Sequence, residues 1–171
     1  GLTMTTATEL EFFIFRESFE QMQDHKYHDM TPVSPYNEDY HIFQTTREEG
    51  VMQPIRNGLY GAGIRVESSK GEADPGQVEL NIHYSDALDM ADTHVLVKNA
   101  VKEIAWQNGR SVTFMAKWHH SAAGSSGHIH QSLCDKKGKS VFFDPKAKHG
   151  MSKLMQQALA GMLKHVDETT F

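Results

Sequence analysis

The chain has 171 residues, of which 39% are hydrophobic and 23% are charged; these values fit one ordinary globular domain and exclude a disordered or low-complexity chain. No apolar run approaches the roughly 18 residues of a membrane span, and a net charge of −5 argues against a broad nucleic-acid-binding surface. The single cysteine, Cys134, cannot form an internal disulfide. We therefore expect a cytoplasmic location and neither a membrane nor a nucleic-acid partner.

In chain order, the alternation of apolar and polar residues first predicts a strand over residues 9–15. The polar, proline-containing stretch 16–34 then predicts a loop. Ser34 followed by Pro35 is a favourable helix start. These two residues predict a helix that runs to about Glu49 and ends at Gly50.

The rest of the pattern alternates strands with further helices. Helices are predicted over residues 51–59, 86–109 and 151–166. Strands are predicted over residues 63–67, 77–84, 111–116, 128–134 and 140–143. Because the strands are mostly joined as hairpins and the helices are inserted irregularly, we expect an α+β fold. In this fold a mostly antiparallel sheet is flanked by helices, and residues 1–171 form part of one domain.

Several acids and histidines stand at positions where they share one face of a strand or flank a turn that enters one. They are Glu9, Glu11, Glu72, Glu79, His128 and His130. Residues two apart in a strand point to the same face. Four carboxylates on one face would repel each other unless cations neutralised them, and two divalent cations would balance their charge. A carboxylate-rich set of ligands suits Mg²⁺ or Mn²⁺ better than Zn²⁺.

Each of these features also has a plainer interpretation. Alternating glutamates are usually the solvated face of a strand, and the same holds for His-x-His. Glu67 would ordinarily be an edge charge, and the small-residue loop over 122–127 would ordinarily be a flexible hairpin. Taken singly, none of these features identifies a function.

Taken in order, however, these segments resemble the catalytic domain of glutamine synthetases, and the match covers almost the whole chain. The two most specific segments are Gly-Gln-x-Glu at 76–79 and Gly-Ser-x-x-His-x-His-x-Ser-Leu at 124–133. The remaining segments are Glu-x-Glu-Phe-Phe at 9–13, Glu67, Glu72 and Thr-Phe-Met-Ala-Lys at 113–117.

The resemblance implies a role for each matched position. The ligands of the metal ion nearer the amino-acid substrate would be Glu11, Glu72 and Glu79. The ligands of the metal ion on the nucleotide phosphates would be Glu9 and His128. The residues that line ATP would be Glu67, His130, Gln131 and Ser132, and those that meet the substrate glutamate would be Ala123 and Gly124.

The activity implied by the resemblance is an ATP-dependent ligase with two or more Mg²⁺ or Mn²⁺ ions per site. ATP phosphorylates the side chain of glutamate, and ammonia then displaces phosphate from the γ-glutamyl phosphate to form an amide. An N-terminal β-grasp domain and a C-terminal part of the catalytic domain, with key arginines, are expected to lie outside the chain. We therefore expect the 171-residue chain to be inactive and of low oligomeric state, and the complete protein to be a homododecamer.

Three departures from the family pattern favour an alternative activity. Ala123 stands where glutamine-forming members commonly have Asn, residues 115–118 read Met-Ala-Lys-Trp in place of Met-Pro-Lys-Pro, and the spacing from Glu72 to Glu79 is one residue shorter. These changes resemble the branch that joins glutamate to polyamines or other amines. A non-catalytic relative and a cupin-like metal protein are further alternatives. The cupin alternative is weak because Leu133 and Cys134 stand where a carboxylate is expected.

Overall fold

The computed structural model describes residues 1–169. The chain forms two compact units, of which the larger is Ala7–His130 and the smaller comprises Gly1–Thr6 together with the residues from Gln131 onward. Strands β1 (Thr3–Phe15) and β6 (Gly127–Cys134) each contribute residues to both units. Among the helices of the described residues, none combines the length and apolar character that crossing a membrane requires.

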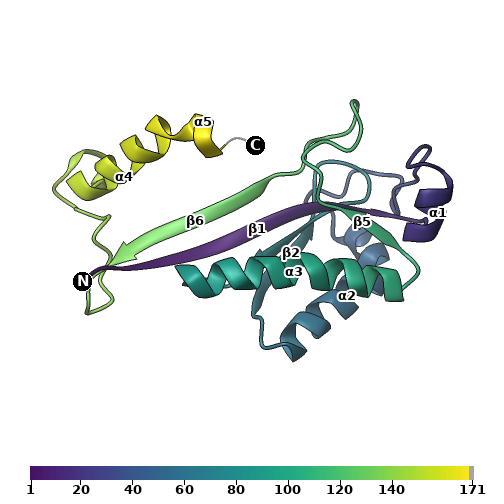
Figure 1. Ribbon diagram of the computed structural model, residues 1–171, viewed down its shortest axis with the longest axis horizontal. Helices are drawn as coiled ribbons and strands as arrows, with labels where there is room; N and C mark the ends of the chain where they lie inside the picture. The colour runs from purple at the N-terminus through teal and green to yellow at the C-terminus, as the bar shows by residue number, and fades with distance from the viewer. Residues whose placement is uncertain (170–171) are drawn as a thin grey trace. The chain divides into compact units, whose positions relative to one another are not determined.

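A mostly antiparallel sheet forms the framework of the larger unit (Figure 1). Strand β1 pairs antiparallel with β3 (Gln77–Ile82), which in turn pairs antiparallel with β2 (Val66–Gly71). The end of β1 pairs antiparallel with β5 (Ser111–Thr113), and β4 (Ser85–Asp86) and β6 also pair with β1. The predicted α+β fold with a mostly antiparallel sheet and flanking helices is confirmed.

The two long helices, α2 (Ile42–Gly61) and α3 (Ala87–Gln107), lie on the same side of the sheet (Figure 1). The main core lies between them and the sheet. Its buried strand residues include Leu10, Phe12, Ile14, Val78, Leu80 and Ile82, and its buried helix residues include Ile55, Leu59, Val97 and Val101. Full burial of one such side chain contributes roughly 1.5–3 kcal/mol. Because strand residues alternate, this core leaves Glu9 and Glu11 on the opposite face.

Helix α3 begins and ends where the sequence predicts. The side chain of Asp86 accepts a hydrogen bond from the backbone N–H of Leu88 at 3.0 Å, which caps the first turn. Just past the helix, Gly109 adopts a left-handed conformation with a φ of 64°.

Two predictions for residues 16–50 are wrong. The stretch predicted as a loop contains the short helix α1 (Phe19–Asp24), which a capping box between Ser18 and Gln21 initiates. Ser34 does not start a helix, since its buried hydroxyl bonds to the backbone of Tyr36 in a tight turn. Helix α2 begins later, with His41 as its N-cap.

Helix α2 is continuous where two pieces were predicted. It passes through Gly50 and Pro54, residues that cost a helix about 1 and about 3 kcal/mol respectively. Its buried residues Val51, Ile55 and Leu59 pack into the main core, and this tertiary packing outweighs the local preference.

The boundaries of the shorter strands also differ from the prediction. Strand β2 begins at Val66 rather than Gly63 and extends to Gly71, because it pairs with β3 along that length. Strand β5 ends at Thr113, and the predicted strand over 140–143 is reduced to two isolated bridges, Cys134 with Ser140 and Phe143 with Met151.

The smaller unit contains a 3₁₀ helix, η1 (Lys148–Gly150), and two helices, α4 (Lys153–Lys164) and α5 (Val166–Thr169). The hydroxyl of Ser152 caps α4 by accepting from the N–H of Met155 at 3.1 Å, so the helix predicted over 151–166 is present with a later start and a break.

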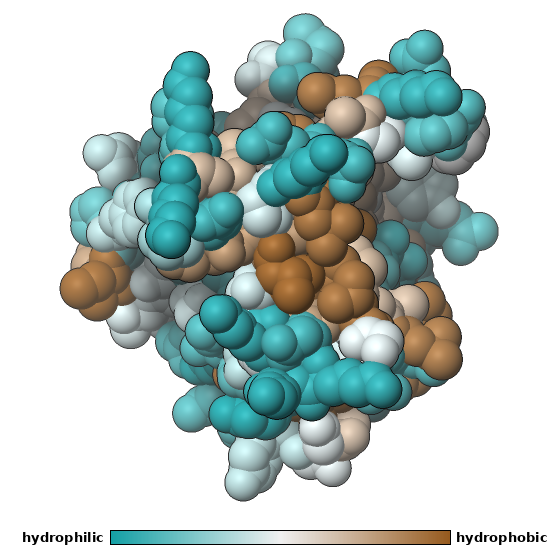
Figure 2. Space-filling view, turned by 90° about the vertical axis from the view of Figure 1, so that its left-hand side faces the viewer, coloured by the Kyte–Doolittle hydropathy of each residue, from teal (hydrophilic) through white to brown (hydrophobic). Residues whose placement is uncertain are grey.

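Hydrophobic side chains are exposed at several places in the chain, and Figure 2 shows some of them gathered among hydrophilic ones on one face.

The buried carboxyl of Glu48 on α2 gives a first testable prediction. Burial, together with the charge of Glu38, raises the pKa of Glu48 from 4.5 to about 7. Between these two pH values the folded chain binds more protons than the unfolded chain, so its stability falls as the pH rises. We expect a loss of about 1–3 kcal/mol between pH 5 and pH 8, measured by urea unfolding. The loss should be much smaller in Glu48→Gln and unchanged in Glu103→Gln, whose side chain is exposed.

Candidate functional site

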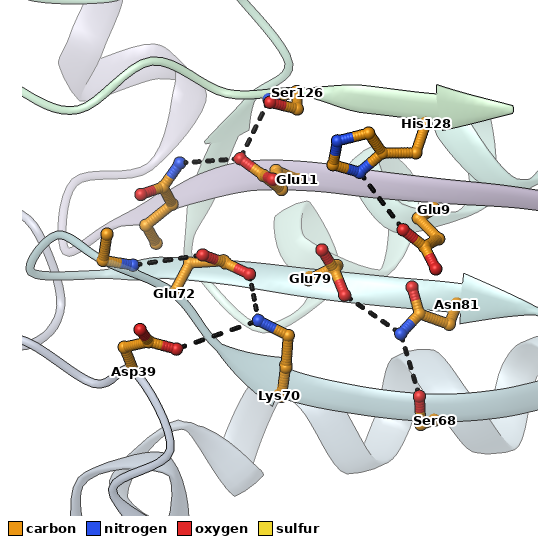
Figure 3. Close-up of polar contacts among 12 residues, drawn as sticks. Glu9, Glu11, Asp39, Ser68, Lys70, Glu72, Glu79, Asn81, Ser126 and His128 are labelled. Carbon is orange, nitrogen blue, oxygen red and sulfur yellow. Dashed lines mark hydrogen bonds and ion pairs between the residues drawn. The ribbon is translucent and has the colours of Figure 1, made fainter.

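The acidic residues lie on the face of the sheet that α2 and α3 leave uncovered. In the register between β1 and β3, Glu11 stands opposite Glu79 and Glu9 stands opposite Asn81. Figure 3 shows these four side chains on neighbouring strands, with His128 reaching toward Glu9 from β6. The alternation that buries the core on one face therefore places the polar set on the other.

Two groups of candidate metal ligands occur on this face. Glu11, Glu72 and Glu79 offer ligand atoms that lie within 4.8 Å of one another, and so do Glu9, Glu79 and His128. Glu79 belongs to both groups, whereas the resemblance assigned it to the first alone. Three carboxylates in one group and two carboxylates with one imidazole in the other are donor sets that fit Mg²⁺ or Mn²⁺.

Glu9 lies between two imidazoles of β6. One of its carboxylate oxygens is 3.1 Å from Nδ1 of His128, and the other is 2.9 Å from Nε2 of His130. Glu9 is half-buried, whereas both histidines are exposed. Residues two apart on β6 point to the same face, so both imidazoles of the His-x-His pattern contact the same carboxylate, that of Glu9.

The Glu11 carboxylate is held by donors from two directions. Oε2 of Glu11 accepts from the backbone N–H of Ser126 at 2.8 Å and from the side-chain amide of Gln77 at 3.2 Å. The same Gln77 amide donates to the carbonyl of Gly124 at 2.9 Å and contacts the hydroxyl of Ser125 at 3.3 Å. Gln77 is only 1% exposed, so one buried amide joins a candidate metal ligand to the loop before β6.

A second contact ties this loop to the turn between β2 and β3. The backbone N–H of Ala123 donates to Oδ2 of Asp74 at 2.7 Å, and the N–H of Ser125 donates to the carbonyl of Ala116 at 2.9 Å. A Cβ added at Gly124 would lie only 3.2 Å from that Ala116 carbonyl. The structure thus holds Ala123 and Gly124 in a fixed position relative to Glu11.

The Glu79 carboxylate is buried beside other negative charges. Burial raises its pKa, and the negative charges of Glu72 and Glu9 act in the same direction. The amide of Asn81, which donates to Oε1 of Glu79 at 3.0 Å, and the charge of Lys70 oppose this rise. A cation bound beside Glu79 would relieve the remaining repulsion.

A cavity of about 350 Å³ opens beside Glu9, and its lining includes Glu67, Ser68, Asn81 and His130. The structure therefore brings Glu67 and His130, two of the residues expected to line ATP, to one cavity next to a candidate metal ligand. The other two, Gln131 and Ser132, belong to the smaller unit, where the carbonyl of Ser132 accepts from the hydroxyl of Thr5 at 3.5 Å.

The residue-by-residue interpretation of the sequence missed four polar contributors to this face, which are Lys70, Asp74, Gln77 and Asn81. For Gln77 and Asn81 a signal existed, since both alternate with the buried residues of β3 and so share the face of Glu79. The roles of Lys70 and Asp74 depend on contacts between segments, which local spacing does not reveal.

The chain matches the protein family described as "Glutamine synthetase, catalytic domain", and the match covers residues 1–171. The chain belongs to this family. The match leaves no support for the cupin-like alternative, and it agrees with the resemblance stated from the sequence.

Relatives within the glutamine synthetase family include enzymes named for amines. The chain is 44% identical over 163 residues to gamma-glutamylethanolamide synthetase GlnA4 of Streptomyces coelicolor, covering 95% of this chain and 34% of that protein. It is 36% identical to glutamate–isopropylamine ligase of Pseudomonas sp., covering 95% of this chain and 36% of that protein. It is 32% identical to glutamine synthetase of Methanosarcina mazei, covering 99% of this chain and 36% of that protein. The chain thus spans about a third of the length of these relatives.

Solved structures of the glutamine synthetase type share the fold. Apo GmaS without ligand superposes with a TM-score of 0.81 at 25% identity, covering 96% of this chain and 38% of that one. A GmaS/ADP complex gives a TM-score of 0.82 at the same identity, covering 96% of this chain and 37% of that one.

The buried amide of Gln77 gives a second prediction. Replacement by Met in Gln77→Met removes the donor shared by Glu11 and Gly124, and buried acceptors left without a donor cost about 1–3 kcal/mol. We expect a loss of unfolding free energy of that size, together with faster hydrogen exchange at the N–H of Ser126. Gln107→Met, at an exposed position on α3, is the matched control. Equal stability of the two variants would contradict this role.

Proposed function

We propose that this chain supplies the metal-binding and glutamate-facing part of an ATP-dependent ligase that joins the side-chain carboxyl of glutamate to an amine. The observation that carries the proposal is the position of Glu79, whose carboxylate belongs to two neighbouring groups of candidate ligands. Two cation sites that share a ligand are suited to a reaction in which a phosphoryl group passes between two anionic substrates.

In this proposal Glu11, Glu72 and Glu79 hold the ion nearer glutamate, and Glu9, Glu79 and His128 hold the ion on the nucleotide phosphates. The bound ions would neutralise the charge on the transferred phosphoryl group. The chain's own residues supply positioning: Gln77 and Ser126 orient Glu11, and the same network fixes the loop that would meet glutamate. Such positioning contributes to catalysis by holding the reactants in line.

The proposed reaction has two steps. The side-chain carboxylate of glutamate attacks the γ-phosphorus of ATP, which releases ADP and forms γ-glutamyl phosphate. The nitrogen of the second substrate then attacks the acyl carbon, and phosphate leaves as the amide forms. Glu67 and His130, which line the cavity beside Glu9, are proposed to contact the nucleotide, together with Gln131 and Ser132.

An amine is the favoured second substrate, and ammonia is the second candidate. The relatives at 44% and 36% identity carry names of amine-derived products or substrates, whereas the glutamine synthetase of M. mazei is 32% identical. Ala123 agrees with this preference, because it lacks the side-chain amide that glutamine-forming members commonly place there. The proposal therefore takes a small primary amine as the nucleophile.

Because the chain spans about a third of its relatives' length, we propose that the rest of the catalytic machinery, including key arginines, comes from residues outside it. The 171-residue chain alone is then inactive and of low oligomeric state. The complete protein is proposed to be a cytoplasmic homododecamer that acts on ATP, glutamate and an amine or ammonia.

The shared position of Glu79 predicts how metal binding responds to single substitutions. The 171-residue chain should bind Mn²⁺ in two steps, which can be counted by electron paramagnetic resonance of the free ion. Glu79→Gln should weaken both steps, and Glu72→Gln should weaken only one, by roughly tenfold or more, since each removes a charged ligand. Glu103→Gln is the control. Binding that survives Glu79→Gln unchanged would rule out this site.

The preference for an amine can be tested by placing the chain in a relative. In this experiment the 163 matched residues of the S. coelicolor enzyme are exchanged for those of this chain, and phosphate release is measured with ATP and glutamate. We expect ethanolamine or isopropylamine to be used at least about tenfold better than ammonia, and the isolated 171-residue chain to give no turnover.

A folded chimera that prefers ammonia would support the second candidate, a glutamine-forming enzyme. A folded chimera that binds Mn²⁺ and releases no phosphate would favour a non-catalytic relative. The assembly state of the chimera, measured by light scattering, serves as the control for folding.

A further inference from the structure

Lys70 lies at the edge of the candidate metal site without being one of its ligands. It stands opposite Glu79 in the register between β2 and β3, and its ammonium group hydrogen-bonds to the carboxylate of Glu72. The ammonium also lies 3.9 Å from Oδ1 of Asp39 and 5.0 Å from the ring centre of Tyr40. Figure 3 shows the Lys70 side chain directed between Asp39 and Glu72.

Lys70 brings a positive charge to the candidate ligand acids. Across residues 1–169, no other lysine or arginine forms an ion pair with any of the four candidate ligand acids. A lysine ammonium is ordinarily protonated at neutral pH, so Lys70 supplies one positive charge beside the candidate ligand carboxylates.

An ammonium and a divalent ion at this place depend on the same carboxylate. Glu72 is a member of the group with Glu11 and Glu79, and it is also the partner of Lys70. The second carboxylate oxygen of Glu72 accepts from the backbone N–H of Ala73 at 3.2 Å. Both oxygens of Glu72 are thus engaged by donors, and a divalent ion must share Glu72 with Lys70 or displace it.

We propose that Lys70 is an internal counter-ion that stabilises the metal-free site and thereby limits its affinity for a divalent ion. The inference rests on the proposed function, because it takes Glu11, Glu72 and Glu79 to be a metal site. In the metal-free chain Lys70 reduces repulsion among the acids. When the ion binds, the same positive charge opposes it and competes for Glu72. Lys70 is therefore a residue that tunes metal affinity through Glu72.

The test compares Mn²⁺ binding to four forms of the 171-residue chain: wild type, Lys70→Met, Lys70→Arg and Lys98→Met. Lys98 is the matched control, since its ammonium lies 5.5 Å from the ring centre of Phe114 and none of the ion pairs within residues 1–169 joins it to a candidate ligand. We expect Lys70→Met to bind Mn²⁺ about tenfold more tightly, which corresponds to about 1.4 kcal/mol. Lys70→Arg, which keeps the charge, should stay within about twofold of wild type, as should Lys98→Met.

Thermal unfolding separates this role from a purely structural one. The metal-free Lys70→Met chain should unfold at a lower temperature than wild type, and its rise in Tm on adding Mn²⁺ should be larger, because tighter binding stabilises the folded state more. If Lys70 only packs and hydrogen-bonds, the substitution lowers Tm with and without Mn²⁺ by the same amount. That result overturns the proposal.

Weaker or unchanged Mn²⁺ binding by Lys70→Met also overturns the role of Lys70. Lys70→Gln, which removes the charge and keeps a polar side chain, must repeat the result of Lys70→Met, and circular dichroism confirms that each variant is folded. Failure of the wild type to bind Mn²⁺ would instead overturn the proposed function and this inference with it. The two failures are therefore distinguishable in one set of titrations.

Discussion

Repulsion among buried and half-buried carboxylates is the constraint on which the rest of this structure depends. Glu11 faces Glu79 across a strand pair, and Glu72 and Glu9 lie close enough for their charges to raise the pKa of Glu79 further. A fold gains nothing in stability from gathering like charges in this way. The surrounding donors, which are Gln77, Asn81, Ser126 and Lys70, each offset part of the cost. Such an arrangement is typical of a site that is completed by cations.

One face of the sheet packs into the hydrophobic core, and the opposite face carries the candidate functional residues. Strands β1 and β3 bury Phe12 and Leu80 against α2 and α3, and the period of two in these strands places Glu11 and Glu79 on the other side. The same backbone therefore fixes the distance between the acids and anchors them to a packed core. Side chains mounted on paired strands are held more precisely than side chains on loops, and the loop that carries Ala123 and Gly124 is tied to the strands by Gln77 and Asp74.

Sequence patterns predict the parts of this fold that local chemistry determines. Helix α3 has a capping aspartate at one end and a left-handed glycine beyond the other, and both of its boundaries follow from these residues. The residues around α2 mislead for two reasons. Gly50 and Pro54 are local breaking signals that packing of α2 against the core overrides, and the hydroxyl of Ser34 bonds to the backbone of Tyr36 instead of capping a helix. For the candidate site, alternation and a family resemblance point to the acids and to His128. Spacing alone cannot reveal that Glu79 belongs to both groups of candidate ligands, since this depends on the register between β1 and β3 and on the approach of β6.

The contact between Lys70 and Glu72 shows why a set of ligands does not by itself determine how a site binds ions. The carboxylates set the attraction for a divalent ion, but the free energy of binding also includes the contacts that the metal-free site gives up. In the role proposed for Lys70, an ammonium that already pairs with Glu72 makes that cost larger, while its charge offsets repulsion among the acids when no ion is bound. On this proposal, stability without the ion and affinity for it are opposed through one side chain. Replacing Lys70 would then change metal affinity while the candidate ligands themselves stay the same.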